Sequence, residues 1–472
     1  MYVEPRGDRG TTGPARLRQA LGSDVICAGR GGRGALATAV REAVRSGRLA
    51  PGTRLPSSRQ LAADLGLARN TVADAYGDLV AEGWLTARRG SGTLVTDRTI
   101  RRPVLVPPAA EPPGEPPHDL HPGNPDLTTF PRAAWLKATR RAMATAPDDA
   151  FGYGDPRGRP ELRAALAETL IRTRGVYTSP EHILICAGVS HGLQILGEVL
   201  AGRAARSVAV ESYGPGRHRD LLAAAGLQTL PLPLDTHGTD PVPPDGTDAV
   251  LLTPAHQFPV GTTLQRDRRT AVVDWARRTG GLVLENDYDG EFRFDHQAVG
   301  ALQGLAPDCV VYLGTASHTL APGLRLAWMV LPATLAEEAA AAKGQIDSCE
   351  VSSQLTMAEF ITSGAYNRHV RAARRRYRDR RNSLVTALAQ HAPEVRVTGT
   401  AAGLHTLLSL LPGTEQRVVQ SATRQGLRVA GLSRYRHERS QHVMADALVV
   451  GYGTPSDAVW PQALSALTRI LS

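Results

Sequence analysis

The stretch that decides the fold of most of this chain is Gly314–Leu326, which reads GTASHTLAPGLRL. The preceding residues 309–313, CVVYL, are apolar and β-branched, which predicts a buried strand. Small residues and hydroxyls then indicate a loop, and Arg325 follows His318 by seven residues. Ligands of α/β sheets bind at the loops that follow strands, so this loop is a candidate binding site.

Other apolar runs place this strand in a larger sheet. Residues 183–186, 207–210, 249–252 and 281–284 are short and apolar, and helical patterns separate them from His121 onward. This alternation predicts an α/β sheet with crossover helices. A small or polar loop follows each strand, as a ligand-binding edge requires.

Length and composition narrow the class of protein. A chain of 472 residues with 42% hydrophobic content predicts two or three packed domains. The net charge of +9 favours an anionic partner, nucleic acid first. Lys137 and Lys343 are the only lysines, so nearly all the positive charge is arginine.

The cysteines and the apolar runs point to a cytoplasmic location. Cys27, Cys186, Cys309 and Cys349 lack metal-ligand spacing, so we expect core residues and no metal site. Scattered cysteines suit a reducing compartment. No apolar run reaches the ~18 residues of a membrane span, and the first residues lack a signal-peptide pattern.

Residues 35–95 carry a second pattern. A helix is expected from Ala35 to about Ser46, and a short helix capped by Ser57 or Ser58 ends at Gly66. A further helix is expected over residues 69–82, and residues 83–95 predict a hairpin with a glycine-rich tip. Together these elements predict a winged helix-turn-helix, which binds double-stranded DNA.

The expected DNA contacts come from the start of the second helix and from the wing. The alternatives are a basic domain that binds protein and, for Arg89, a solvated charge. The predicted contact residues are Ser57, Arg59, Arg69, Asn70, Thr71, Arg88, Arg89, Gly90 and Gly92.

This region resembles the GntR family of bacterial regulators over about sixty residues. The matching segments are 47–49 (GRL), 55–57 (LPS), 69–72 (RNTV) and 90–92 (GSG). One departure is Ala68, where the family usually has a Ser or Thr helix cap; its loss costs about 1 kcal/mol.

The large region resembles the aminotransferase-like domain of PLP fold type I. The matching motifs are 123–126 (GNPD), 153–156 (YGDP), 253–261 (TPAHQFPVG) and 402–405 (AGLH). Joined to a GntR domain, it resembles the MocR subfamily. The resemblance implies pyridoxal phosphate (PLP) as cofactor, a homodimer and a small-molecule effector. We expect a poorly ordered extension at 1–33, the winged helix-turn-helix at 34–96, a Pro-rich linker at 97–120 and the aminotransferase-like domain at 121–472.

The resemblance also shows what the PLP site lacks. In the family, a lysine in the loop that corresponds to Gly314–Leu326 holds PLP, and here that position is His318. Lys137 and Lys343 follow no strand-loop pattern, so we expect surface charges. Without the amine we expect no internal aldimine and no transaminase activity.

Two further positions depart from the family. The carboxylate that pairs with the pyridine nitrogen precedes Tyr288 by two residues, which gives Asn286, with Asp287 pointing the other way. The stacking tyrosine corresponds to Pro215, with Tyr213 displaced by two.

Anion binding is expected to survive at the phosphate end. The predicted ligand-binding residues are Val189, Ser190, His256, Asn286, Tyr288, Thr315, His318 and Arg325, and candidates for an effector carboxylate are Arg428, Arg434 and Arg436. We therefore favour a ligand-sensing DNA-binding regulator. The alternatives are a PLP- or pyridoxamine phosphate (PMP)-dependent enzyme with His318 as base, and a regulator that binds PLP noncovalently.

Overall fold

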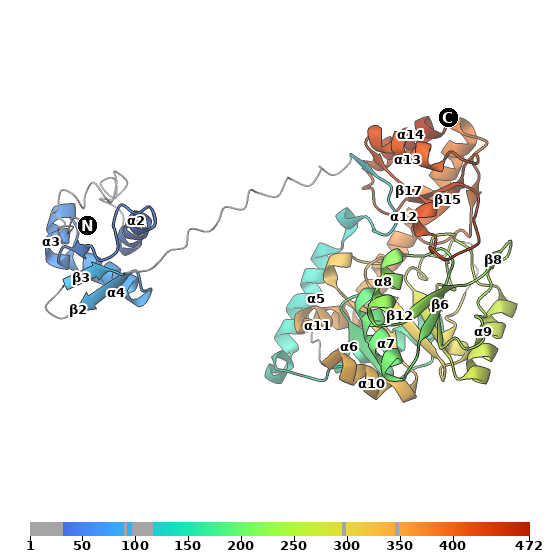
Figure 1. Ribbon diagram of the computed structural model, residues 1–472, viewed down its shortest axis with the longest axis horizontal. Coiled ribbons are helices and arrows are strands. Elements are labelled where there is room, and N and C mark those ends of the chain that lie inside the picture. Colours follow the sequence, from blue (N-terminus) through green and yellow to red (C-terminus); the bar gives the residue numbers. More distant parts are fainter. Residues whose placement is uncertain (1–31, 89–91, 97–116, 295–298, 345–348) are drawn as a thin grey trace, which may run out of the picture. The chain divides into compact units, whose positions relative to one another are not determined.

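The computed structural model describes residues 32–88, 92–96, 117–294, 299–344 and 349–472. The chain divides between Pro113 and Gly114 into two compact units (Figure 1). The predicted N-terminal extension up to residue 31, and the predicted linker up to residue 116, lie outside the described residues.

The smaller unit contains the predicted helices and hairpin. Its elements are α2 (Arg33–Arg45), β1 (Arg54–Leu55), α3 (Ser58–Leu65), α4 (Arg69–Ala81), β2 (Leu85–Arg88) and β3 (Gly92–Val95). β3 pairs antiparallel with both β1 and β2. The inward side chains expected from the helical periodicity are all buried: Leu36, Val40, Ala43, Val44, Val72, Ala75, Tyr76 and Leu79.

Helix boundaries in this unit follow local chemistry. The Ser57 hydroxyl accepts a hydrogen bond from the Gln60 backbone N–H at 3.3 Å and so caps α3. Gly66 ends α3 at φ +67°, a left-handed conformation that favours glycine. Both predictions are confirmed. Ala68 precedes α4 without a side-chain cap, as the sequence indicates.

The larger unit is built on a seven-stranded mixed sheet. Its order is β5 (Ile183–Cys186), β13 (Ala327–Val330), β12 (Val310–Thr315), β11 (Leu282–Asp287), β10 (Ala249–Leu252), β6 (Ser207–Val210) and β7 (Gln228–Pro231). The five predicted strands are confirmed. The apolar runs of the sequence do not predict β7 and β13; β13 is antiparallel to both of its neighbours.

Helices cover both faces of this sheet (Figure 1). One face packs against α7 (Val189–Gly202), α8 (Gly216–Ala224) and α10 (Ala333–Gly344). The other packs against α5 (Arg132–Thr145), α6 (Pro160–Arg174), α9 (Arg266–Thr279) and α11 (Val351–Thr362). Strand alternation sends Leu313 into the first layer and Tyr312 into the second.

The C-terminal part of this unit forms a smaller sheet with its own helices. Its elements are α12 (Ala365–His391), β14 (Val397–Thr398), β15 (His405–Ser409), α13 (Glu415–Arg424), β16 (Leu427–Arg428), β17 (Ala430–Gly431), β18 (Ala447–Gly451) and α14 (Trp460–Leu471). β4 (His118–Asp119) pairs with β16, so the large unit begins inside the predicted linker, 97–120. The small ribbon of β8 (Leu234–Asp235) and β9 (Gly238–Thr239) completes the strands.

No helix within the described ranges combines the length and apolarity that crossing a bilayer requires.

Candidate functional site

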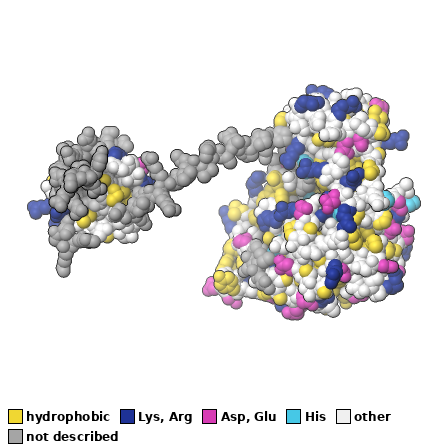
Figure 2. Space-filling model, viewed as in Figure 1, with side chains coloured by type: hydrophobic (Ala, Val, Ile, Leu, Met, Phe, Trp, Pro, Cys, Tyr) yellow, Lys and Arg dark blue, Asp and Glu magenta, His cyan; other side chains and the backbone are white. Residues whose placement is uncertain are grey.

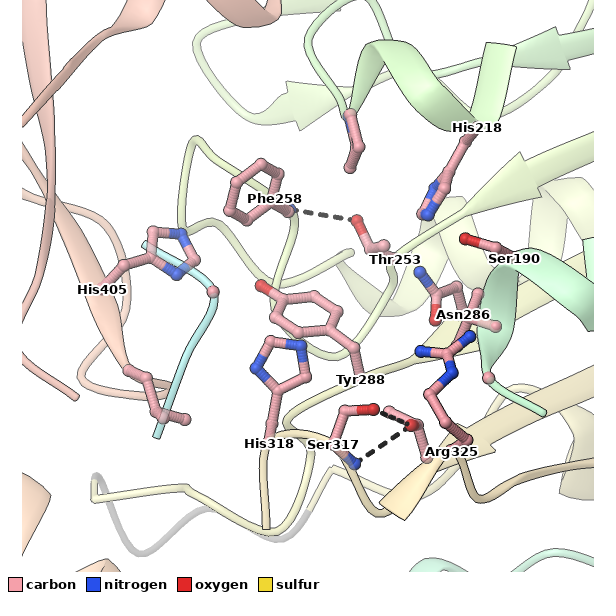
Figure 3. Close-up of a pocket in the computed structure, with 16 residues that line it drawn as sticks. Ser190, His218, Thr253, Phe258, Asn286, Tyr288, Ser317, His318, Arg325 and His405 are labelled. Carbon is pink, nitrogen blue, oxygen red and sulfur yellow. Dashed lines mark hydrogen bonds between the residues drawn. The ribbon is translucent and has the colours of Figure 1, made fainter. Parts of the chain in front are cut away.

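A cavity of about 260 Å³ opens at the carboxyl ends of β11 and β12 (Figure 3). Loops of the main sheet, the start of α7 and the start of β15 form its walls. Its lining residues are Gly123, Gly188, Val189, Ser190, Pro215, His218, Thr253, Phe258, Asn286, Tyr288, Thr315, Ser317, His318, Arg325, Leu404 and His405. Seven of the eight predicted ligand-binding residues are among them, and His256 is the exception.

One end of the cavity is arranged to hold an anion. Gly188 stands at φ +117° immediately before α7, and a Cβ there would fall 2.7 Å from Arg325 Nη2. Glycine therefore allows the guanidinium to approach the positive end of the α7 dipole. Arg325 forms no ion pair with a described residue, so a structural salt bridge does not explain it. A helix N-terminus and a free arginine together favour phosphate or carboxylate.

Hydroxyl groups fix the loop beneath this end. The Thr315 hydroxyl donates to Ser317 Oγ at 2.9 Å and accepts from the Ser317 backbone N–H at 3.1 Å (Figure 3). Arg325 itself adopts φ +51°, which is uncommon for a residue with a Cβ. These hydrogen bonds and the Arg325 backbone conformation shape the loop that runs from β12 to Arg325.

At the end of the cavity where the resemblance places the pyridine ring of PLP, the polar side chain is an amide. Asn286 lines the cavity, and its Oδ1 is buried with no hydrogen-bond partner among the described residues. Asp287 points to the opposite face of β11, as predicted, where its Oδ2 accepts from Arg174 Nε at 2.6 Å and from Tyr312 at 2.8 Å. The Asp287 carboxylate is therefore bound on the opposite face of β11 and does not face this cavity.

His318 lies against Tyr288. The two rings meet edge to face with centroids 5.3 Å apart (Figure 3). Burial lowers the pKa of His318, although Asp289 acts in the opposite direction. A neutral imidazole binds as a hydrogen-bond donor or acceptor and does not attract an anion by charge.

His256, one of the predicted ligand-binding residues, does not line this cavity. His256 lies behind Tyr288: its Nδ1 is 2.8 Å from Asp289 Oδ2, and the Tyr288 hydroxyl donates to its carbonyl at 3.0 Å. Gly403 makes room for this pair, since a Cβ there would collide with His256 and Asp289. His256 therefore positions Tyr288.

Sequence reasoning missed three large side chains of the cavity wall. Burial lowers the pKa of His218 to about 4 and that of His405 to about 3, and Phe258 packs edge-on against Tyr288 at 6.1 Å. Phe258 and His405 stand inside motifs that carry the family resemblance, so those motifs contained the signal. His218 follows Pro215 by one helical turn and has no such signal.

Pro215 lines the cavity, as its alignment with the stacking tyrosine predicts. Tyr213 does not: its hydroxyl accepts from the Met444 N–H at 2.9 Å in the small sheet domain. None of the three proposed carboxylate arginines lines the cavity, and Arg428 instead pairs with Asp119 at 3.4 Å. Arg434 lies in the short 3-10 turn Leu432–Tyr435 that follows β17, and Arg436 directly follows that turn.

The two lysines have different environments. Lys137 is exposed on α5, as expected. Lys343 is not a surface charge: it is 2% exposed, and its Nζ donates to the Pro156 carbonyl. The correction arises because Lys343 lies on the inward side of α10. Neither lysine lines the cavity.

Two arginines of the smaller unit, Arg33 and Arg41, form ion pairs within it, whereas two of the predicted DNA contacts form none among the described residues. Arg41 pairs with Glu82 at 2.6 Å, and Arg33 pairs with Asp78. Arg59 and Arg69 are exposed and form no ion pair with a described residue. Asn70 is also exposed and Thr71 is half-buried at the start of α4. Gly92 begins β3, whereas Arg89, Gly90 and the Arg88 side chain lie outside what the structure describes.

Comparisons with known proteins agree with both units. Residues 33–95 match the model of bacterial regulatory proteins of the gntR family, and residues 119–438 match aminotransferase class I and II. The pyridoxine biosynthesis transcriptional regulator PdxR of Corynebacterium glutamicum is 34% identical, over 84% of this chain and 87% of that protein. The chain belongs to the MocR-type regulators of the GntR family.

Other relatives of this MocR-type regulator support the same assignment. The probable rhizopine catabolism regulatory protein MocR of Rhizobium meliloti is 32% identical, over 84% of this chain and 85% of that protein. The kynurenine aminotransferase of Pyrococcus horikoshii shares the fold of the large unit, with a TM-score of 0.66 over 75% of this chain and 90% of that one at 24% identity.

The cavity of this MocR-type regulator fits only part of the PLP that its fold family implies. The phosphate end has Arg325 and the α7 N-terminus. A covalently held PLP also needs a lysine amine, and the described lining residues include none. The orphaned Asn286 Oδ1 marks a second misfit, because an amide cannot neutralise a protonated pyridine nitrogen.

Proposed function

We propose that this regulator binds operator DNA through Arg59, Arg69 and its wing, and that its cavity binds a small anionic effector noncovalently. The observation that supports effector binding is Arg325: it forms no ion pair with a described residue and stands beside the N-terminus of α7, while His318 lies where the resemblance places the family's lysine. A cavity with an anion end and no amine suits a reversible ligand.

The proposed DNA contact rests on the start of α4. Arg69 and Asn70 are exposed where a recognition helix meets base edges and phosphates. Over the visible face of the large unit, positive and negative side chains are interspersed (Figure 2). The unpaired arginines of the smaller unit are therefore the better candidates for a DNA surface.

We further propose that the protein is a homodimer without transaminase activity. Tyr153 is fully exposed and Phe151 is 57% exposed within the motif region that the family shares, which suits an interface between two copies. His318 and Asn286 remove the amine and the ring carboxylate that transamination uses. The enzyme alternative, with neutral His318 as base, still lacks that carboxylate.

A titration with PLP and PMP tests the effector proposal. We expect saturable, reversible binding of both compounds, measured by calorimetry, and no borohydride-stable adduct by mass spectrometry. The variant His318→Lys should gain such an adduct with PLP but not with PMP. A stable adduct on the unmodified protein, or no binding of either compound or of inorganic phosphate, would refute the proposal.

Anisotropy with DNA from upstream of its own gene tests the DNA proposal. We expect salt-sensitive, specific binding, because phosphate contacts release counterions. Binding that ignores salt, or that is equal for scrambled DNA, would contradict it.

A further inference from the structure

A second cavity lies on the other face of the main sheet, enclosed by α6, α11 and α12. Its volume is about 240 Å³, and it shares no lining residue with the first cavity. Five aliphatic or thioether side chains form much of its wall: Leu166, Leu170, Met357, Ile361 and Val370. A cavity of this size is several times the ~30 Å³ that one water occupies in the liquid, so it has room for a small organic molecule.

Two residues of this lining each carry a buried donor that has no acceptor among the described residues. Arg174 is 5% exposed and Trp328 is 4% exposed, and neither Arg174 Nη2 nor Trp328 Nε1 has a hydrogen-bond partner among the described residues. Gly314 lets the indole take this place, since a Cβ at Gly314 would collide with Trp328 Nε1. Buried donors are nearly always paired in folded proteins, so both call for an acceptor that the described residues do not supply.

The charges around the cavity are mostly positive. Arg172, Arg371 and Arg374 also line it, and none forms an ion pair with a described residue. The one carboxylate in the described lining, Glu291, accepts a hydrogen bond from the Tyr366 hydroxyl at 3.1 Å, and burial raises its pKa to about 7. The neighbouring Asp287 is already bound to Arg174. The excess of cationic groups favours an anionic ligand.

We infer that this second cavity is a binding site for a small organic acid with an apolar body. The aliphatic wall receives the body, and the arginines and the two buried donors receive the oxygens. The site goes beyond the proposed effector cavity and stands independently of it.

Side-chain contacts connect the second cavity to a loop that borders the first cavity. The Tyr366 hydroxyl lies 3.3 Å from Thr319 Oγ1, and His369 Nε2 lies 2.7 Å from the Thr319 carbonyl. Thr319 follows His318 directly in the loop that borders the first cavity. An acid that displaces Tyr366 therefore acts on that loop.

Calorimetry on the full chain tests the site with benzoate, phenylacetate and isovalerate, each against its uncharged amide. We expect at least one acid to bind saturably and its amide not to bind. Arg371→Ala should weaken that acid about tenfold or more, because a charge-assisted hydrogen bond is lost. Arg375→Ala is the matched control: it removes an exposed arginine of the same helix outside the cavity lining, and affinity should persist.

Arg325→Ala separates this site from the first cavity. Acid affinity unchanged by Arg325→Ala supports the second site, whereas its loss would place the acid in the first cavity and overturn the inference. The absence of saturation for all three acids up to about 10 mM, weaker than any useful site, would also overturn it. So would equal losses in Arg371→Ala and Arg375→Ala. None of these measurements depends on DNA binding.

Discussion

Arg69 and Arg325 are both arginines at the positive end of a helix, but their surroundings differ. Arg69 begins α4 on an exposed surface, whereas Arg325 reaches the start of α7 inside a cavity. In both places an unpaired cation adds to the helix dipole, an arrangement that an anion stabilises. The difference in shape predicts different binding partners. An exposed surface suits a polyanion such as DNA, and an enclosed cavity suits one small anion.

The largest expected effect on binding comes from removing the cavity arginine. Arg325→Ala should weaken PMP binding by about 2–3 kcal/mol, because a charge-assisted phosphate contact is lost. Calorimetry measures the change. DNA affinity without ligand should stay the same. If PMP affinity is unchanged, Arg325 does not hold the anion and the parallel with Arg69 fails.

Removing the exposed arginine is the reciprocal test. Arg69→Ala should cost about 1–3 kcal/mol of specific DNA affinity and leave PMP binding unaltered. Anisotropy at fixed salt reports it. Arg41→Ala serves as the control, because Arg41 is already paired with Glu82 and should change DNA affinity little. Equal losses in both variants would assign the effect to general charge.

The cavity region also differs from the exposed start of α4 in burial, and the pH dependence of folding stability reveals this difference. Glu211 lies behind the cavity and accepts from the Thr253 hydroxyl at 2.5 Å; burial raises its pKa to about 8. The folded protein therefore keeps a proton that the unfolded chain releases above about pH 4.3. This stabilisation is complete below that pH and is lost as pH rises toward 8, by at most about 1.4 kcal/mol per unit.

Glu211→Gln should remove that slope between pH 5 and 8, measured by urea unfolding of the large unit over this range of roughly three units. Glu338→Gln is the control, since Glu338 is exposed, pairs with Arg203 and has a lowered pKa. An unchanged slope in Glu211→Gln would mean that the carboxyl is ionised in the folded protein.

The smallest effect concerns the start of α4. Ala68→Ser should supply the missing cap and raise the stability of the smaller unit by about 0.5–1 kcal/mol. Ser57→Ala should lose a similar amount, because the Ser57 hydroxyl caps α3. Thermal unfolding measures both. A loss of stability in Ala68→Ser would show that the uncapped backbone N–H groups at the start of α4 already have other hydrogen-bond partners.

Sequence reasoning was most successful where structure is set locally. Gly66, Ser57 and the apolar periodicity of α4 act within a few residues, so their roles were readable. Strand period likewise placed Asn286 and Asp287 on opposite faces of β11. These features need no knowledge of distant contacts.

The remaining features depend on residues brought together from far along the chain. His256 was assigned to the ligand because its motif borders the cavity, but Asp289 and the space above Gly403 turn it away. The sequence predicts a surface charge at Lys343, because a local pattern does not show the Pro156 carbonyl, 187 residues away along the chain. His218 and the whole second cavity were missed for the same reason.

The alternation along β11 has a genetic consequence. Asn286 faces one chamber, while Asp287, through Arg174, anchors the wall of the other, so a single peptide unit forms the partition between them. A shift of this strand is therefore expected to act on both cavities. Suppressors of a defect at Asn286 should therefore be sought among residues across the partition as well as beside it.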